Sequence, residues 1–151
     1  MNEEYKIVDV PAQPCVFIRR TLAKDGLGEF YMEVLPKVFQ FAAQHGIAPS
    51  APFGRYPEWG ENGGTVEAGI ATRTSVEGEG EIVSGTLGGS RAVMGTHMGA
   101  YEGLPDAFSR LFDWCREQGH EPSGPCWELY VDDPESKPAD EVRTELYIPI
   151  K

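Results

Sequence analysis

The segment Gly46-Ile47-Ala48-Pro49-Ser50-Ala51-Pro52 returns 73 positions later as Gly119-His120-Glu121-Pro122-Ser123-Gly124-Pro125. In both copies an amphipathic segment precedes the glycine, and a segment rich in β-forming residues follows the second proline. Self-similarity at a fixed offset is the sequence signature of a repeated structural unit. The sequence therefore predicts that these 151 residues fold as one unit built twice.

A helix is predicted before each glycine that opens the repeated segment. The same offset aligns Val34 with Ala107, Leu35 with Phe108, Val38 with Leu111, Phe41 with Trp114 and Ala42 with Cys115. This spacing places each apolar set on one helix face. Pro105 suits the first turn of the second helix, and Gly46 and Gly119 suit the left-handed residue that ends a helix. Pro36 interrupts the first pattern, so we expect the first helix to kink or restart there.

Strands are predicted around both helices from β-branched and aromatic residues. They cover residues 14–22, 52–56 and 65–75 in the first half, and 90–98, 125–131 and 142–150 in the second. Each half therefore reads strand, helix, strand, strand, and residues 76–81 form an exposed linker. The pattern predicts an α+β fold with pseudo-twofold symmetry and an antiparallel sheet with helices on one side. The opposite faces form a ligand cleft between the halves or are merely solvated.

The whole chain is predicted to be a single domain, with internal repeats at about 5–75 and 90–151. A chain of this length buries enough surface to fold without a disulfide or a metal. The irregular spacing of Cys15, Cys115 and Cys126 fits reduced thiols rather than a disulfide framework or a metal motif. No signal-peptide pattern and no long apolar run is present, so we expect a cytoplasmic protein with no membrane partner.

The formal net charge of −11 argues against direct nucleic-acid binding, which depends on clustered Lys and Arg. An acidic surface concentrates cations, including organic cations, around any cleft that it lines. The same charge also serves solubility alone, and composition does not separate the two roles.

Two Glu-x-Tyr pairs lie in the last two predicted strands: Glu128 with Tyr130, and Glu145 with Tyr147. Side chains alternate between the faces of a strand, so the members of each pair share a face. The inward positions would then be Leu129, Leu146 and Ile148. On that assumption all four polar side chains point the other way, and the sequence predicts an aromatic, acid-lined pocket.

Each of these residues also has a structural interpretation. Glu128 could bond backbone amides or Arg143, and Glu145 could be a cross-strand partner of Arg143 or Arg91. Tyr130 and Tyr147 fit the amphiphilic lining of a pocket, but also ordinary core packing. Trp114 lies on the apolar helix stripe, which favours the core.

Trp59 and His97 complete the set of predicted ligand-binding residues. Trp59 lies in a Gly- and Pro-rich stretch, 57–64, which predicts a flexible loop that closes over a ligand or packs incidentally. His45, His97 and His120 are too scattered to indicate a metal site. No phosphate-binding loop, nucleophile elbow or HExxH motif occurs, so we predict neither a metal nor a cofactor.

The stretch GPCWELYVDDP at 124–134, followed by RTELYIPI at 143–150, resembles the end of the GyrI-like small-molecule-binding domain. His97-Met98-Gly99-Ala100-Tyr101, leading into a helix with Trp114, is similar to the family's strand-to-helix passage. Glu67-Ala68-Gly69-Ile70 is similar, more loosely, to the family's Glu-x-Gly-x strand. The resemblance spans nearly the whole chain and is most specific after residue 90.

The resemblance implies a pseudo-symmetric fold with a cleft between the halves. The family serves multidrug-responsive regulators, stand-alone drug-sequestering proteins and gyrase-inhibitory proteins, and some relatives hydrolyse cyclopropane-bearing toxins. No DNA-binding module accompanies the domain here, so the sequence resembles the stand-alone form. Glu128 matches the family's acidic position and is the first choice for a ligand contact; His97 matches the passage described above.

Three functions follow as expectations. The first is a binding protein that sequesters or senses lipophilic, cationic or aromatic compounds, with Glu128 as charge partner. The second is a ring-opening hydrolase in which Glu128 activates water and Tyr130 or Tyr147 supports the oxyanion. The third is an inhibitory protein partner of a gyrase-like topoisomerase, based on the family and the acidic charge.

Overall fold

The computed structural model describes residues 5–132 and 136–151 and divides the chain into two units. One unit is Pro11–Gly89, and the other joins Ser90–Lys151 to the N-terminal strand. No helix in the described ranges is long and apolar enough to cross a bilayer.

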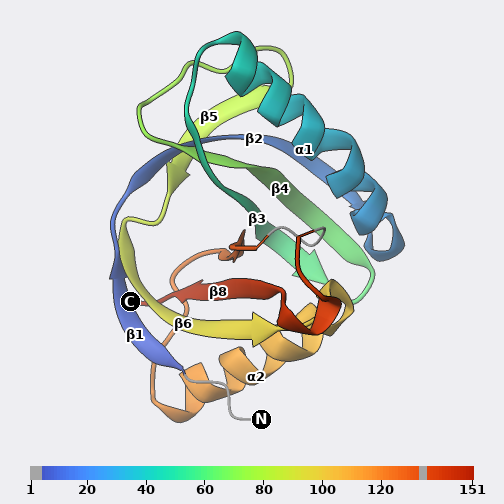
Figure 1. Cartoon of the computed structure of the whole chain (residues 1–151). Helices are drawn as coiled ribbons and strands as arrows, with labels where there is room; N and C mark the ends of the chain where they lie inside the picture. The colour runs from blue at the N-terminus through green and yellow to red at the C-terminus, as the bar shows by residue number, and fades with distance from the viewer. Residues whose placement is uncertain (1–4, 133–135) are drawn as a thin grey trace. The chain divides into compact units, whose positions relative to one another are not determined.

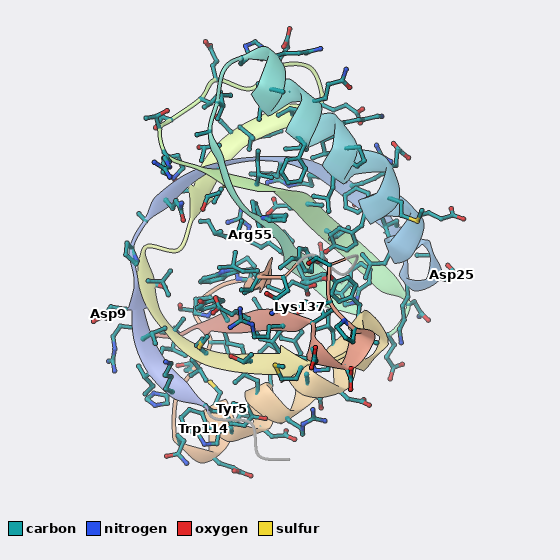
Figure 2. The ribbon with its side chains drawn as sticks, in the orientation of Figure 1. Tyr5, Asp9, Asp25, Arg55, Trp114 and Lys137 are labelled. Atoms are coloured by element: carbon teal, nitrogen blue, oxygen red, sulfur yellow. The ribbon has the colours of Figure 1, made fainter. Side chains whose placement is uncertain are left out.

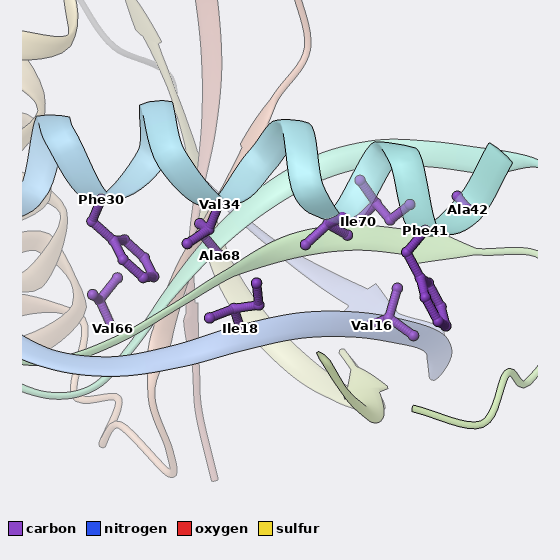
Figure 3. Packing of buried hydrophobic residues seen from close by; sticks show 10 residues of the cluster. Val16, Ile18, Phe30, Val34, Phe41, Ala42, Val66, Ala68 and Ile70 are labelled. Atoms are coloured by element: carbon purple, nitrogen blue, oxygen red, sulfur yellow. The ribbon is translucent and has the colours of Figure 1, made fainter. Parts of the chain in front are cut away.

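The unit Pro11–Gly89 is a four-stranded antiparallel sheet with one helix on one face (Figure 1). Its elements are β2 (Gln13–Ala23), the short 3₁₀ turn η1 (Lys24–Gly26), α1 (Leu27–Gln44), β3 (Pro49–Gly60), β4 (Gly63–Thr72) and β5 (Ile82–Leu87). The strand order is β3-β4-β2-β5. Figure 3 shows Phe30, Val34 and Phe41 of α1 directed at apolar side chains of β2 and β4. The apolar stripe predicted for this helix is therefore its buried face.

The second unit has the same design. Its elements are β1 (Lys6–Val10), β6 (Ser90–Met98), η2 (Tyr101–Gly103), α2 (Leu104–Glu117), β7 (Cys126–Tyr130), η3 (Ala139–Glu141) and β8 (Arg143–Pro149). The strand order is β1-β6-β8-β7, again antiparallel. Ala107, Leu111 and Cys115 of α2 pack against Leu146 and Ile148 of β8 in one buried cluster.

The predicted α+β class and the duplication are confirmed. Each unit contains strand, helix, strand, strand in sequence, as β2-α1-β3-β4 and as β6-α2-β7-β8. The division into repeats at about 5–75 and 90–151 stays a prediction.

Two edge strands, β1 and β5, were not predicted. Each pairs with a strand from the other half of the sequence. β1 precedes β2 along the chain but pairs with β6, and β5 precedes β6 but pairs with β2. Figure 1 shows β1 beside β6 and β5 beside β2. Each unit therefore takes its outer strand from the segment that leads into the other unit.

Helix α1 passes through Pro36 as one continuous element, so the predicted restart there was wrong. Pro36 lies on the exposed side of the helix, whereas Val34 and Val38 on either side of it are fully buried. A carbonyl freed by proline on the solvent side can bond water. Burial of the flanking valines then holds the helix together.

Gly46 and Gly119 end the two helices with φ of 65° and 79°, as the sequence predicts. No atom lies within 4 Å of a Cβ added at either position, so substitution meets only the backbone cost. We expect Gly46→Ala and Gly119→Ala each to lower the free energy of unfolding by about 1 kcal/mol. Urea unfolding followed by circular dichroism measures this change.

Gly28 is the matched control, because it lies inside α1 with equally open surroundings and no positive φ. Gly28→Ala should raise the free energy of unfolding by about 0.5 kcal/mol. Equal effects of alanine at Gly28 and Gly46 would contradict the role assigned to the positive φ.

Candidate functional site

The register between β7 and β8 decides which of the predicted site residues share a face. Glu128 lies opposite Leu146 and Tyr130 opposite Thr144, while Trp127 lies opposite Tyr147. Directly opposed residues of an antiparallel pair lie on the same face of the sheet. Since Leu146 packs against α2, Glu128 and Tyr130 lie on the α2 side.

Glu145 and Tyr147 lie on the opposite face, together with Trp127. The prediction that the two Glu-x-Tyr pairs share one face was therefore wrong. It assumed that Leu129 and Leu146 both point into the core, but Leu129 is opposed to Glu145. Strand side chains alternate with period two, so an error of one residue in register reverses a whole strand.

Glu128 is a buried carboxylate bonded to a phenol. Glu128 is only 2% exposed, and the Tyr130 hydroxyl donates a hydrogen bond to its Oε2 at 2.6 Å. The Tyr130 ring lies 5.6 Å from the ring of Tyr101, in the η2 turn that leads into α2. Burying a carboxylate is costly unless polar or charged partners compensate. The α2 side of this unit thus holds a buried acid bonded to a tyrosine, and the ring of that tyrosine adjoins a second tyrosine.

Cys126 lies on the same face, two residues before Glu128. Burial, followed by the negative charge of Glu128, raises the pKa of the Cys126 thiol to about 12. The thiol is therefore protonated at neutral pH and is a poor nucleophile. This chemistry favours a packing role for Cys126 beside the carboxylate.

His97 lies on the same side of the sheet as Glu128, because it is opposed to Thr144, which is opposed to Tyr130. His97 is 9% exposed, and its Nε2 lies 2.9 Å from the carbonyl oxygen of Ala100. The backbone of the η2 turn thus fixes the imidazole. Of the predicted site residues, Glu128, Tyr130 and His97 are brought to one face of one unit.

The second acid–phenol pair forms a separate cluster on the opposite face. The Tyr147 hydroxyl donates to Glu145 Oε1 at 3.0 Å, and the Tyr147 ring stacks on Trp127 with centroids 4.9 Å apart. Burial, then the charge of Glu145 and the hydrogen bond to it, raise the pKa of Tyr147. Arg143, considered above as a partner of either acid, donates to Asp132 through Nε at 3.0 Å. This bond and the charge of Asp132, and then the charge of Glu145, raise the pKa of Arg143.

Trp59 lies in the Pro11–Gly89 unit, at the end of β3 rather than in a flexible loop, so that prediction was wrong. It is opposed to Gly64 across the β3–β4 hairpin. Gly63 and Gly64 adopt positive φ, which allows the strands to reverse tightly. The Trp59 ring lies 5.6 Å from Tyr56, whose hydroxyl is 2.9 Å from that of Tyr31. Contact of Trp59 with a ligand stays a prediction.

Trp114 packs on α2 as its apolar stripe predicts. Figure 2 shows it beside Tyr5, with ring centroids 5.7 Å apart. The described residues include no group of three or more His, Cys, Asp or Glu placed to hold a metal.

A buried ion cluster lies on the face of the Pro11–Gly89 sheet opposite α1. Glu67 of β4 is 2% exposed and accepts hydrogen bonds from Arg19 Nε at 2.7 Å and Arg55 Nε at 2.6 Å. Arg55 also donates through Nη1 to the carbonyl oxygen of Thr86 at 2.8 Å. The cluster joins all four strands of its sheet, so Glu67 has a structural role there.

Sequence analysis did not assign Tyr101 and Thr144 to the site. Tyr101 stands in the strand-to-helix passage that contains His97, and an aromatic residue at that point was the available signal. Thr144 immediately precedes Glu145, and its place beside Tyr130 depends on the strand register, which no local pattern gives. Both lie on the α2 side, beside Tyr130.

Small-molecule-binding domains typically combine aromatic side chains with a few placed polar groups, and the α2 side of this unit has that composition. Residues 3–151 match the model of one such family, the GyrI-like small molecule binding domain. The chain belongs to this family, and the resemblance noted in the sequence is confirmed.

Three solved structures show the same fold. The C-terminal domain of EcmrR is 21% identical with a TM-score of 0.87, covering 100% of this chain and 99% of that chain. SAV2435 bound to tetraphenylphosphonium is 16% identical with a TM-score of 0.68, covering 98% and 94% of the two chains. A hydrolase from Listeria innocua is 11% identical with a TM-score of 0.65, covering 98% and 92%.

The chain spans 57% of the length of EcmrR as seen in its complex with DNA. A search of curated proteins gives no match.

Proposed function

We propose that this protein binds lipophilic organic cations and thereby sequesters or senses them, with Glu128 as the charge partner. The observation that carries the proposal is the burial of the Glu128 carboxylate beside Tyr130, whose ring adjoins that of Tyr101. A bound cation offsets the cost of burying this charge, and aromatic faces add attraction of about 0.5–2 kcal/mol per good contact.

The aromatic lining continues from the buried acid to the surface of the same unit. Tyr101 is 38% exposed, and its ring adjoins that of the partly buried Tyr130. A flat or globular hydrophobic cation can therefore meet aromatic surface before it meets the carboxylate. A carboxylate has about four lone-pair sites, so Glu128 can keep the Tyr130 hydrogen bond while it faces a cation.

Two further facts support a cationic ligand. SAV2435, a protein of the same fold, was solved with tetraphenylphosphonium, which is a lipophilic cation. The net charge of −11 raises the concentration of any cation near the surface.

The test is a tryptophan-fluorescence titration with tetraphenylphosphonium and with tetraphenylborate, an anion of nearly the same size and shape. Trp114 of α2 and Trp127 of β7 belong to the same unit as Glu128 and serve as reporters. We expect saturable binding of the cation at least about tenfold tighter than of the anion, a difference of about 1.4 kcal/mol. Equal affinity for both ions, or no saturable signal, would reject a charge-reading site.

A second candidate is a hydrolase, favoured by the hydrogen bond that already joins a carboxylate to a phenol. Glu128 could accept a proton from water as the water oxygen attacks a ring carbon and a ring C–C bond breaks. The Tyr130 hydroxyl, released from the neutralised Glu128, could then donate to the oxyanion that receives the electron pair of that bond. Mass analysis after incubation with a cyclopropane-bearing electrophile separates the candidates. A hydrated product formed faster with the protein than in buffer supports hydrolysis, whereas a ligand recovered intact supports binding alone.

A further inference from the structure

Thr144 carries a buried hydroxyl whose Oγ1 has no hydrogen-bond partner among the described residues. The residue is 0% exposed. Buried polar atoms of folded proteins are nearly always hydrogen-bonded, and one that is not destabilises the native state. Apolar packing therefore does not explain why a hydroxyl is buried at position 144.

The position of Thr144 connects it to the candidate site. It is the middle member of a cross-strand row formed by His97 of β6, Thr144 of β8 and Tyr130 of β7. The row lies on the α2 side, and Glu128 lies in the next row of the same face, opposite Leu146. The unpartnered hydroxyl is thus a lateral neighbour of Tyr130, whose own hydroxyl bonds the buried acid.

The polar atoms of the two flanking side chains, Tyr130 and His97, bond groups other than the Thr144 hydroxyl. The Tyr130 hydroxyl donates to Glu128, and His97 Nε2 lies against the carbonyl oxygen of Ala100. Nearby positions on this face are filled by apolar side chains such as Val93, Leu146 and Ile148. A valine at position 144 would have the same branched shape without a buried hydroxyl, so the hydroxyl is the distinctive part of this residue.

We propose that Thr144 is a second polar contact of the ligand site, and that the ligand combines a positive charge with a hydrogen-bonding group. This inference rests on the proposed function. Glu128 reads the charge, and the Thr144 hydroxyl, which can donate and accept, bonds a hydroxyl, amine or carbonyl of the ligand. Ligand binding then satisfies an atom that the free protein leaves without a partner.

The test compares tetraphenylphosphonium with its three mono-hydroxyphenyl analogues, in which one phenyl ring carries a hydroxyl at the ortho, meta or para position. We expect at least one isomer to bind the wild-type protein about tenfold tighter than the parent cation. Thr144→Val should abolish this advantage, so that all four cations bind the variant with affinities within about twofold of one another. Thr144→Ser, which retains the hydroxyl, should preserve most of it.

Thr96→Val is the matched control, because Thr96 is opposed to Glu145 on the other face of the same sheet. It should leave all four affinities unchanged. An isomer preference that survives in Thr144→Val, or no preference in the wild type despite tight binding of the parent, would overturn the role of Thr144 alone. If none of the four cations binds, the proposed function fails, and this inference fails with it.

Urea unfolding gives a readout that does not depend on a ligand. Removing an unpartnered hydroxyl should leave the unfolding midpoint of Thr144→Val equal to or above that of the wild type. A clear fall in the midpoint would show that the hydroxyl is already satisfied in the free protein, for example by a buried water, and would overturn the inference.

Discussion

Glu128→Gln is expected to weaken binding of tetraphenylphosphonium by about tenfold to a hundredfold, or about 1.4–2.8 kcal/mol. Glutamine keeps the size of the side chain and an oxygen that can accept the Tyr130 hydrogen bond. It removes the negative charge, which is the part that a buried cation needs. Calorimetry of wild type and variant with the same cation measures the loss.

The Glu128 variant should not lose stability along with affinity. Glutamine fills the same space and can keep accepting from the Tyr130 hydroxyl, so the urea midpoint should stay close to that of the wild type. A variant with lower affinity and a much lower midpoint would instead indicate that Glu128 is a structural residue.

Glu145→Gln is the matched control for this experiment. Glu145 also accepts a hydrogen bond from a tyrosine two residues away, but on the opposite face of β8. We expect it to leave cation affinity within about twofold of the wild type. An equal loss in both variants would contradict the assignment of the site to the α2 side.

Glu67→Gln is expected to lower the free energy of unfolding by about 3 kcal/mol, because it removes the anion of a buried ion cluster. Arg55 and Arg19 would then lie next to each other without the charge that both now bond. The Arg55 side chain is only 15% exposed, so water can compensate little of the loss. Since whole domains are stable by about 5–15 kcal/mol, the loss is large.

Urea unfolding of Glu67→Gln is best read beside Glu33→Gln. Glu33 also accepts from two basic side chains, Arg20 and Lys37, but Glu33 and Lys37 are well exposed to solvent and Arg20 is partly exposed. Exposed ion pairs contribute little, so we expect its midpoint to stay close to that of the wild type. Similar midpoints for both variants would indicate that the buried ion cluster contributes no more to stability than the exposed ion pairs do.

Local patterns predicted a large part of the fold. The glycine–proline repeat and the two apolar stripes gave the duplication, and β6 begins and ends where β-branched and aromatic residues indicated. The buried face of each helix also agrees with its stripe, because helical periodicity is a property of a single segment. Recognition of the family supplied Glu128 as the first candidate.

Features that depend on distant pairing were not predictable in this way. The faces of Glu128 and Glu145 follow from a register between two strands, and nothing within either strand states that register. Trp59 looked like a loop residue because glycines surround it, but those glycines close a hairpin. The short strands β1 and β5 lack a strong pattern of their own, since each is an edge strand defined by its partner.

The exchange of β1 and β5 has a consequence for the origin of the molecule. Lys6 pairs with Met94, so the first strand of the chain completes a sheet built from the second half of the sequence. A single ancestral repeat with the same pairing would have given its first strand to another copy of itself. That ancestor would have been a domain-swapped homodimer, and gene fusion would have made the swap intramolecular.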